Sequence, residues 1–133
     1  MRTLILIFIL LFPLAAFCQQ SPAELNESAV NERRFDPKHS FVLANRAYQM
    51  ALELKDSSQV ALSLKNMGVA LYFQSSLDSA AFFLEKSLEY YTTLNDSIGM
   101  SAAANNLGLV CKDLIRIDDS ENYFMLSLEI DYL

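Results

Sequence analysis

The chain has 133 residues, 53% of them hydrophobic, and a formal net charge of −6 at pH 7. This length allows one compact domain or a short repeat array, and it excludes two ordinary domains. An acidic surface repels phosphate backbones and anionic lipid headgroups, and Arg33–Arg34 is the only adjacent pair of Lys or Arg residues. Nucleic-acid binding is therefore not expected.

The segment 1–18 has the layout of a secretory signal peptide, because Arg2 is followed by an apolar run and then by Pro13 and small residues. The uncharged stretch is shorter than the roughly 20 residues that a membrane-spanning helix needs. We expect cleavage after Cys18 and export of the segment 19–133 to the periplasm or cell envelope. The alternative is lipid attachment at Cys18, although bulky Phe17 departs from the lipoprotein pattern.

Chemistry-bearing side chains are sparse in the remainder of the chain. Cys111 would be the only thiol after cleavage, so no internal disulfide can form, and its apolar neighbours predict a buried core residue. His39 is the only histidine, and no Cys or second His stands at metal-ligand spacing from it. We therefore expect no catalytic site, no metal site and no cofactor.

From Ser21 onward the sequence predicts helices and no strand. Ser21-Pro22-Ala23-Glu24 is typical of a helix start, in which the Ser hydroxyl and the Glu carboxylate cap each other's backbone amides. Asp36, Asp56 and Asp96 are expected to cap later helices in the same way, and Ser75–Ser76 and Asp118–Asp119 mark the remaining turns. Six helices are predicted, over about 22–34, 37–55, 58–74, 77–94, 98–114 and 117–132.

A regular recurrence relates these helices, since KNMGVALYF at 65–73 and NNLGLVCKD at 105–113 share Asn, a large apolar residue and Gly in the same places. Small residues at fixed positions suggest points where two antiparallel helices approach closely, because bulk there would hold the helices apart. The predicted repeat-packing positions are Ser28, Gly68 and Gly108, then Ser40, Ala80 and Ser120, then Ala47, Ser87 and Ser127.

The order large–x–x–large–Gly–x–x–large, followed by small, large, small, resembles the tetratricopeptide repeat (TPR). The match is carried by Leu64, Met67, Gly68 and Leu71 in the second hairpin, and by Ala104, Leu107, Gly108 and Cys111 in the third. The spacing resembles the long-repeat variety of exported bacterial TPR sensor and scaffold proteins. The resemblance implies an all-α, right-handed solenoid of three antiparallel helix hairpins, with repeats at about 22–55, 58–94 and 98–133 and a degenerate first repeat.

In TPR proteins the first helix of each hairpin lines a concave face, so the resemblance implies a groove that binds a protein or peptide. Asn can both donate and accept hydrogen bonds, and Lys supplies a positive charge, so these side chains could hold a peptide backbone or a terminal carboxylate. Alternatively, the column Asn26, Asn66 and Asn106 bonds to neighbouring helices and keeps the repeats in register. The first hairpin would contribute Leu25, Ala29 and Arg33 to the concave face. The groove residues expected to bind a ligand are Lys65, Asn66, Val69, Tyr72, Phe73, Asn105, Asn106, Leu109 and Lys112.

The last predicted helix becomes more apolar toward its end, where a solenoid normally turns a polar side to solvent. Either another element packs on it or the chain continues, and the residues that would make this contact are Met125, Leu128, Ile130 and Leu133. The sequence therefore leaves two functions open. One is an exported, non-enzymatic peptide-binding module, such as the sensing part of a signalling protein. The other is an assembly adaptor that joins copies, or packs on a continuation, through its last helix.

Overall fold

The computed structural model describes residues 20–131, which form six α-helices and no strand. The helices are α2 (Pro22–Glu32), α3 (Pro37–Glu53), α4 (Ser57–Phe73), α5 (Leu77–Thr93), α6 (Ser97–Asp113) and α7 (Ile117–Asp131). The prediction of an all-helical chain with six helices is confirmed, and the predicted ends lie within two residues of these. The expected leader, the cleavage point at Cys18 and Leu133 lie outside the described residues.

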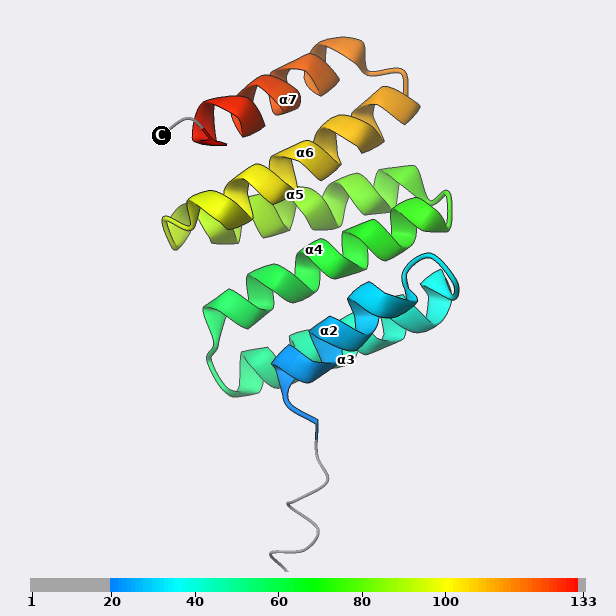
Figure 1. Ribbon diagram of the computed structural model, residues 1–133, viewed down its shortest axis with the longest axis vertical. Coiled ribbons are helices and arrows are strands. Elements are labelled where there is room, and N and C mark those ends of the chain that lie inside the picture. Colours follow the sequence, from blue (N-terminus) through cyan, green and yellow to red (C-terminus); the bar gives the residue numbers. More distant parts are fainter. Residues whose placement is uncertain (1–19, 132–133) are drawn as a thin grey trace, which may run out of the picture.

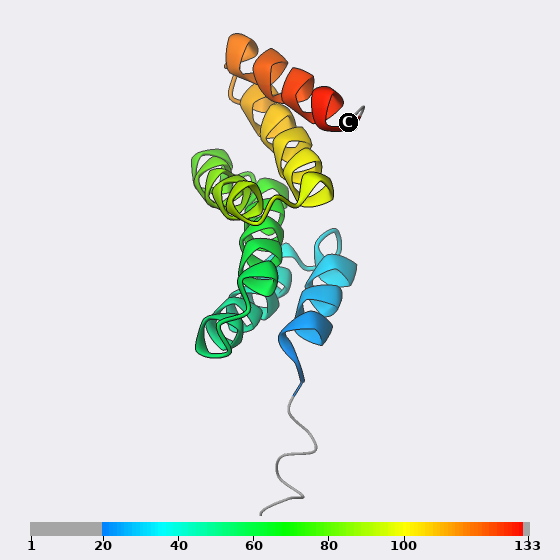
Figure 2. The ribbon, with the colours of Figure 1, turned by 90° about the vertical axis from the view of Figure 1, so that its left-hand side faces the viewer.

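The helices stack in chain order, from α2 at one end to α7 at the other (Figure 1). Each helix packs against the next one in the sequence, and α4 also contacts α2 and α6. The view turned by 90° shows the same order of helix pairs (Figure 2). This repeated helix packing is compatible with a helical solenoid. Within the described residues, none of the helices has the length and apolar character needed to cross a bilayer.

The helix starts follow the predicted capping chemistry. At α2, the Ser21 hydroxyl accepts a hydrogen bond from the Glu24 amide, and the Glu24 carboxylate accepts one from the Ser21 amide. Asp36, Asp56 and Asp96 each accept a hydrogen bond from the amide three residues later. Asp118 and Asp119 lie in the first turn of α7 rather than at its cap, where their charge favours the positive end of the helix dipole.

Four of the connections are copies of one tight turn, which recurs at a constant spacing along the chain. Lys55, Ser75, Asn95 and Ile115 each adopt a positive φ between 53° and 61°, directly after the C-cap residue of a helix. The next amide then bonds back to a carbonyl near the helix end, as from Asp56 to Ala51 at 2.9 Å. The connection between α2 and α3 is different, because the amides of residues 35 and 36 both bond to the Glu32 carbonyl.

The small residues lie where paired helices cross. A Cβ atom added to Gly68 would come within 2.6 Å of Leu84 Cγ on α5, and one added to Gly108 would come within 2.5 Å of the Phe124 ring on α7. The Ser120 hydroxyl donates to the Gly108 carbonyl at 2.9 Å. The backbones at these crossings are therefore close enough that only glycine fits without movement of the neighbour.

In the first hairpin the crossing is shifted by one residue from the predicted register. The Ser40 hydroxyl donates to the carbonyl of Ala29, at 2.7 Å, and Ala29 is fully buried. Ser28 is half-buried, and its hydroxyl donates to the carbonyl of Glu24 in its own helix. The close contact between α2 and α3 therefore uses Ala29 and not Ser28.

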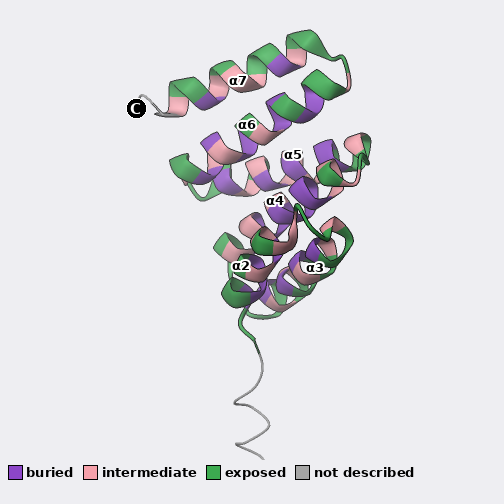
Figure 3. Cartoon of the chain, turned by 45° about the vertical axis from the view of Figure 1, so that its right-hand side comes forward, coloured by how far each residue is buried: buried purple, intermediate pink, exposed green. Residues whose placement is uncertain are grey.

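Buried residues occur in all three hairpins (Figure 3), and the apolar core consists of four clusters linked by the partly buried side chains of Tyr48, Tyr90 and Leu88. Helix α4 has neighbours on several sides and carries nine buried residues, whereas exposed residues gather on the turns and on α7. Ala47, Ala80 and Ser87 are fully buried, and Cys111 is a buried free thiol, as predicted. The Ser87 hydroxyl donates to the Ala61 carbonyl across the second hairpin, and Ser127 pairs with Ser101 in the third.

Candidate functional site

A pocket of about 170 Å³ lies between the carboxyl-terminal ends of α2, α4 and α6. Buried Val69, Leu84 and Val110 are among its lining residues, and Phe73 and Leu109 expose 40% and 38% of their surfaces. Its volume is close to that of an apolar cavity of about 150 Å³ that can hold a benzene molecule. The pocket can therefore accept one ring or one branched aliphatic side chain. Its lining residues are Arg33, Arg34, Val69, Tyr72, Phe73, Leu84, Asn106, Leu109 and Val110.

Two aromatic side chains at the end of α4 contribute to the lining. Tyr72 and Phe73 meet edge to face, with ring centroids 5.7 Å apart. The Tyr72 hydroxyl donates a 2.9 Å hydrogen bond to the Asp113 carboxylate at the end of α6. This bond raises the pKa of Tyr72, because the carboxylate favours the protonated phenol. The contact joins α4 to α6 and restrains the Tyr72 ring beside the pocket.

The pocket also has a basic side. Arg33 and Arg34 come from the connection between α2 and α3, and neither forms an ion pair within residues 20–131. Lys65, half-buried on α4, has a lowered pKa, chiefly because burial disfavours its charge and further because Arg33 repels it, with Asp96 acting in the opposite direction. Positive charges thus gather at one place in an acidic protein, and no carboxylate of the described residues pairs with the two arginines.

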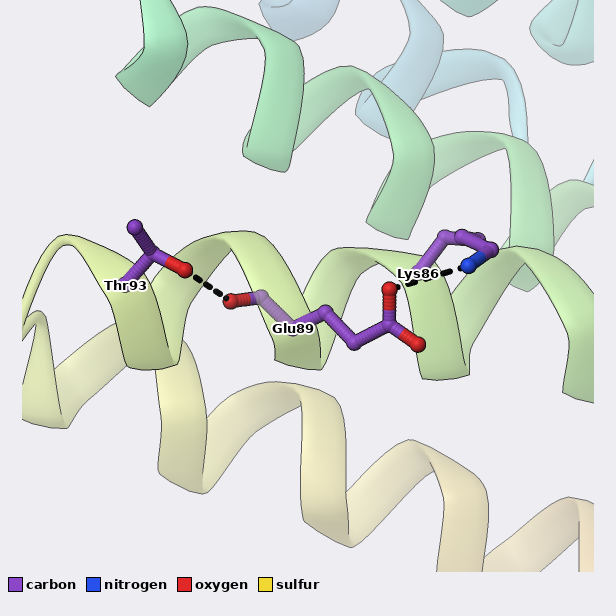
Figure 4. A network of polar contacts seen from close by, with 3 residues as sticks. All are labelled: Lys86, Glu89 and Thr93. Carbon is purple, nitrogen blue, oxygen red and sulfur yellow. Dashed lines mark hydrogen bonds and ion pairs between the residues drawn. The ribbon is translucent and has the colours of Figure 1, made fainter.

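The ion pairs that the described residues do form are exposed and local. Lys86 contacts the Glu89 carboxylate at 2.9 Å on α5, and the Thr93 hydroxyl donates to the Glu89 carbonyl (Figure 4). Arg116 forms the other pair, with Asp119, at 2.8 Å. Such exposed pairs contribute about 0.2–1 kcal/mol each. Each of these two ion pairs joins residues three positions apart in the sequence, whereas Arg33 and Arg34 line the apolar pocket.

Five of the nine groove residues predicted from the sequence lie together at this pocket, and four do not. Lys65 lies on α4 but does not line the pocket, and Lys112 is exposed on α6. Asn105 lines a different groove, between α6 and α7. The residues that the structure brings together are Val69, Tyr72, Phe73, Asn106 and Leu109.

The asparagine column is divided between two roles. Asn66 is only 4% exposed, and its amide donates to Asn26 Oδ1 at 3.0 Å, while Asn26 Nδ2 donates to Ser63 Oγ at 2.9 Å. These bonds join α2 to α4, so Asn66 has little surface for a ligand. Asn106 donates instead to the Ala102 carbonyl in its own helix, at 2.8 Å, and it lines the pocket.

Arg33 was expected on the concave face of the first hairpin but not among the ligand-binding residues, and Arg34 was absent from the predicted groove. Their adjacency was the available signal, since no other Lys or Arg pair stands side by side in this acidic chain.

Comparisons with protein-family models, curated proteins and solved structures found no match to this chain. Residues 20–131 contain no group of three or more His, Cys, Asp or Glu side chains placed to hold a metal ion.

Proposed function

We propose that this chain is a non-enzymatic, TPR-like binding module, and that its pocket binds a peptide with an apolar side chain next to a carboxylate. The observation that carries the proposal is the pair Arg33 and Arg34, unpaired within residues 20–131, beside an apolar pocket in a protein of net charge −6. Guanidinium groups bind carboxylates with charge-assisted hydrogen bonds, often two at once. The pocket would hold the apolar side chain while the arginines bind the acid.

The stacked helices and the glycines at their crossings support the TPR-like assignment. A scaffold of this kind loses little conformational entropy on binding, because its helices are ordered before the ligand arrives. The leader-like segment 1–18 supports export to the periplasm or cell envelope. In that compartment the module would serve as the sensing part of a signalling protein or as a scaffold.

A glycine-flanked, amidated Glu-Glu-Phe peptide and its Gln-Gln-Phe counterpart test the pocket, with binding measured by fluorescence anisotropy. The Gln peptide should bind about ten- to a hundred-fold more weakly, since a hydrogen bond to a charged group contributes about 1.5–3 kcal/mol. Arg33→Ala combined with Arg34→Ala should cause a similar loss. Arg46→Ala removes an exposed arginine on α3 and should leave binding unchanged. Equal binding of the two peptides would contradict the proposal.

The adaptor function has an observation of its own. Met125 and Leu128 expose 57% and 50% of their surfaces on α7, the last described helix of the stack, where polar side chains would be expected to face solvent. Exposed apolar side chains at such an end favour contact with a further element. Sedimentation velocity distinguishes self-association from binding to another molecule, because only self-association raises the mass of the free protein with concentration.

A further inference from the structure

Helices α4 and α6 each fill a groove formed by the two helices that precede them in the stack. Helix α4 covers α2 and α3, where Met67 packs with Ala29 and Ala44. Helix α6 covers α4 and α5, where Leu107 packs with Leu84. The same contact is therefore made twice, in equivalent places of two successive repeats.

The side chains that make this contact follow one pattern. In α4 they stand at residues 60, 63, 67 and 70, and in α6 at residues 100, 103, 107 and 110. The first and third are large and apolar, and the second is Ser or Ala. Spacings of three and four residues place all four on one face of a helix. The residues are Val60, Ser63, Met67 and Ala70 in α4, and Met100, Ala103, Leu107 and Val110 in α6.

The third groove, between α6 and α7, has no described helix in it. This end groove has a volume of about 680 Å³. Ser101 and Leu128 occupy the places of Ala61 and Leu88, which α6 covers one repeat earlier, yet Leu128 is 50% exposed. The lining residues are Ile98, Ser101, Ala102, Asn105, Phe124, Ser127 and Leu128.

A second copy stacked head to tail does not fit this groove. Because the contact of α2 is shifted by one residue, its α2 would present Glu24, Ser28 and Asn31, and the Glu24 carboxylate would stand where α4 has Ser63 and α6 has Ala103. That carboxylate would enter an apolar groove beside α7, whose residues Ile117–Asp131 include acidic residues and no Lys or Arg. Desolvation and like-charge repulsion both oppose such a contact.

The charge of α7 indicates what would fit. Glu121 stands where α5 has the buried Ala81, which packs in one cluster with Leu107 and Val110. A helix in the end groove would therefore meet a carboxylate near the carboxyl-terminal half of its apolar stripe. A Lys or Arg at that place would pair with Glu121 and offset its desolvation.

We propose that the end groove binds an amphipathic helix of a partner protein, with a basic residue facing Glu121. The helix carries large apolar residues at positions i and i+7 and small or β-branched residues at i+3 and i+10. Its contact continues the pattern by which α4 and α6 pack on the helices before them. The site is separate from the arginine pocket and shares no lining residue with it.

The probe is a capped peptide that copies α6 with its C-cap, Ser97–Leu114, with Cys111→Ser and with Lys in place of Leu114, which packs on the cluster that holds Ala81, Leu107 and Val110; a second peptide has Glu at that place. Fluorescence anisotropy with the purified protein should show the Lys peptide binding about ten-fold more tightly than the Glu peptide. The exposed substitution Glu121→Lys should reverse this preference without affecting the fold.

Leu128→Asp should weaken binding of the Lys peptide at least about ten-fold, as expected for a central apolar contact. Leu52→Asp is the matched control, because Leu52 is an exposed leucine on α3 and should leave binding unchanged. No binding of either peptide, or equal losses from the two substitutions, would overturn the proposal. A dimer of the free protein that dissociates in the Leu128→Asp variant would also overturn the proposal, since it would assign the groove to a second copy.

Discussion

Replacing Gly68 by Ala tests whether close helix crossings hold the stack together. In an ordinary helix this substitution stabilises by about 1 kcal/mol, because Ala has the higher helix propensity. Here the new Cβ would lie 2.6 Å from Leu84 Cγ and 3.1 Å from the Ala80 carbonyl oxygen. Leu84 is fully buried and the carbonyl belongs to the backbone, so neither neighbour can move freely.

Overpacking of a dense core costs about 1–3 kcal/mol and a clash with backbone lies toward the upper part of that range, so we expect a net loss of about 1–2 kcal/mol. Chemical denaturation followed by circular dichroism measures this change. Ser79→Ala, at an exposed position on α5, is the propensity control and should be neutral or slightly stabilising.

A double-mutant cycle separates the clash from other effects. Leu84→Ala alone should destabilise by about 2–5 kcal/mol, since it leaves a cavity in the core. Combined with Gly68→Ala, it should cost less than the sum of the two single changes, because the space vacated by Leu84 accepts the new methyl group. A stabilising effect of Gly68→Ala would refute close packing at this crossing.

Three further predictions concern buried polar groups. Burial, reinforced by Asp96, raises the pKa of Tyr91 to about 12. The contribution of Tyr91 to the free energy of unfolding is therefore complete below pH 10 and is lost as the pH rises through 12. In Tyr91→Phe, the free energy of unfolding measured by chemical denaturation should fall less over this pH range. Burial lowers the pKa of Lys65, so Lys65→Met should raise the thermal midpoint at pH 7, with the gain vanishing above the unfolded-state value of 10.5. Asn66→Ala should cost about 1–3 kcal/mol in urea unfolding, because it leaves buried Asn26 Oδ1 without its donor, whereas exposed Asn45→Ala should cost little.

The helices were predictable because their signals are local. Ser21, Asp36, Asp56 and Asp96 all cap as expected, since an N-cap depends only on residues within one turn. The left-handed conformation of Ile115 was not predictable, because a β-branched residue avoids positive φ in isolation. Its conformation follows from the tight turn that the packing of α6 and α7 requires.

The register of the first hairpin and the composition of the site depend on non-local structure. The repeat comparison placed Ser28 at the first crossing, but the connection after Glu32 differs from the other four and the contact moves to Ala29. Val69, Tyr72 and Phe73 line one pocket, because helical spacing puts them near one another at the end of α4. Arg33 and Arg34 join them only through the stacking of α2 on α4.

The measurement that tests the proposed function most directly is a ¹⁵N NMR titration of the protein with the Glu-Glu-Phe peptide. We expect saturable shifts at the amides of Arg33, Arg34, Val69 and Leu109, and none at Glu129 on the exposed side of α7. Those shifts should disappear in the variant that carries Arg33→Ala and Arg34→Ala. Shifts that spread over the whole chain, or that persist in this variant, would contradict a binding site at the arginine pocket.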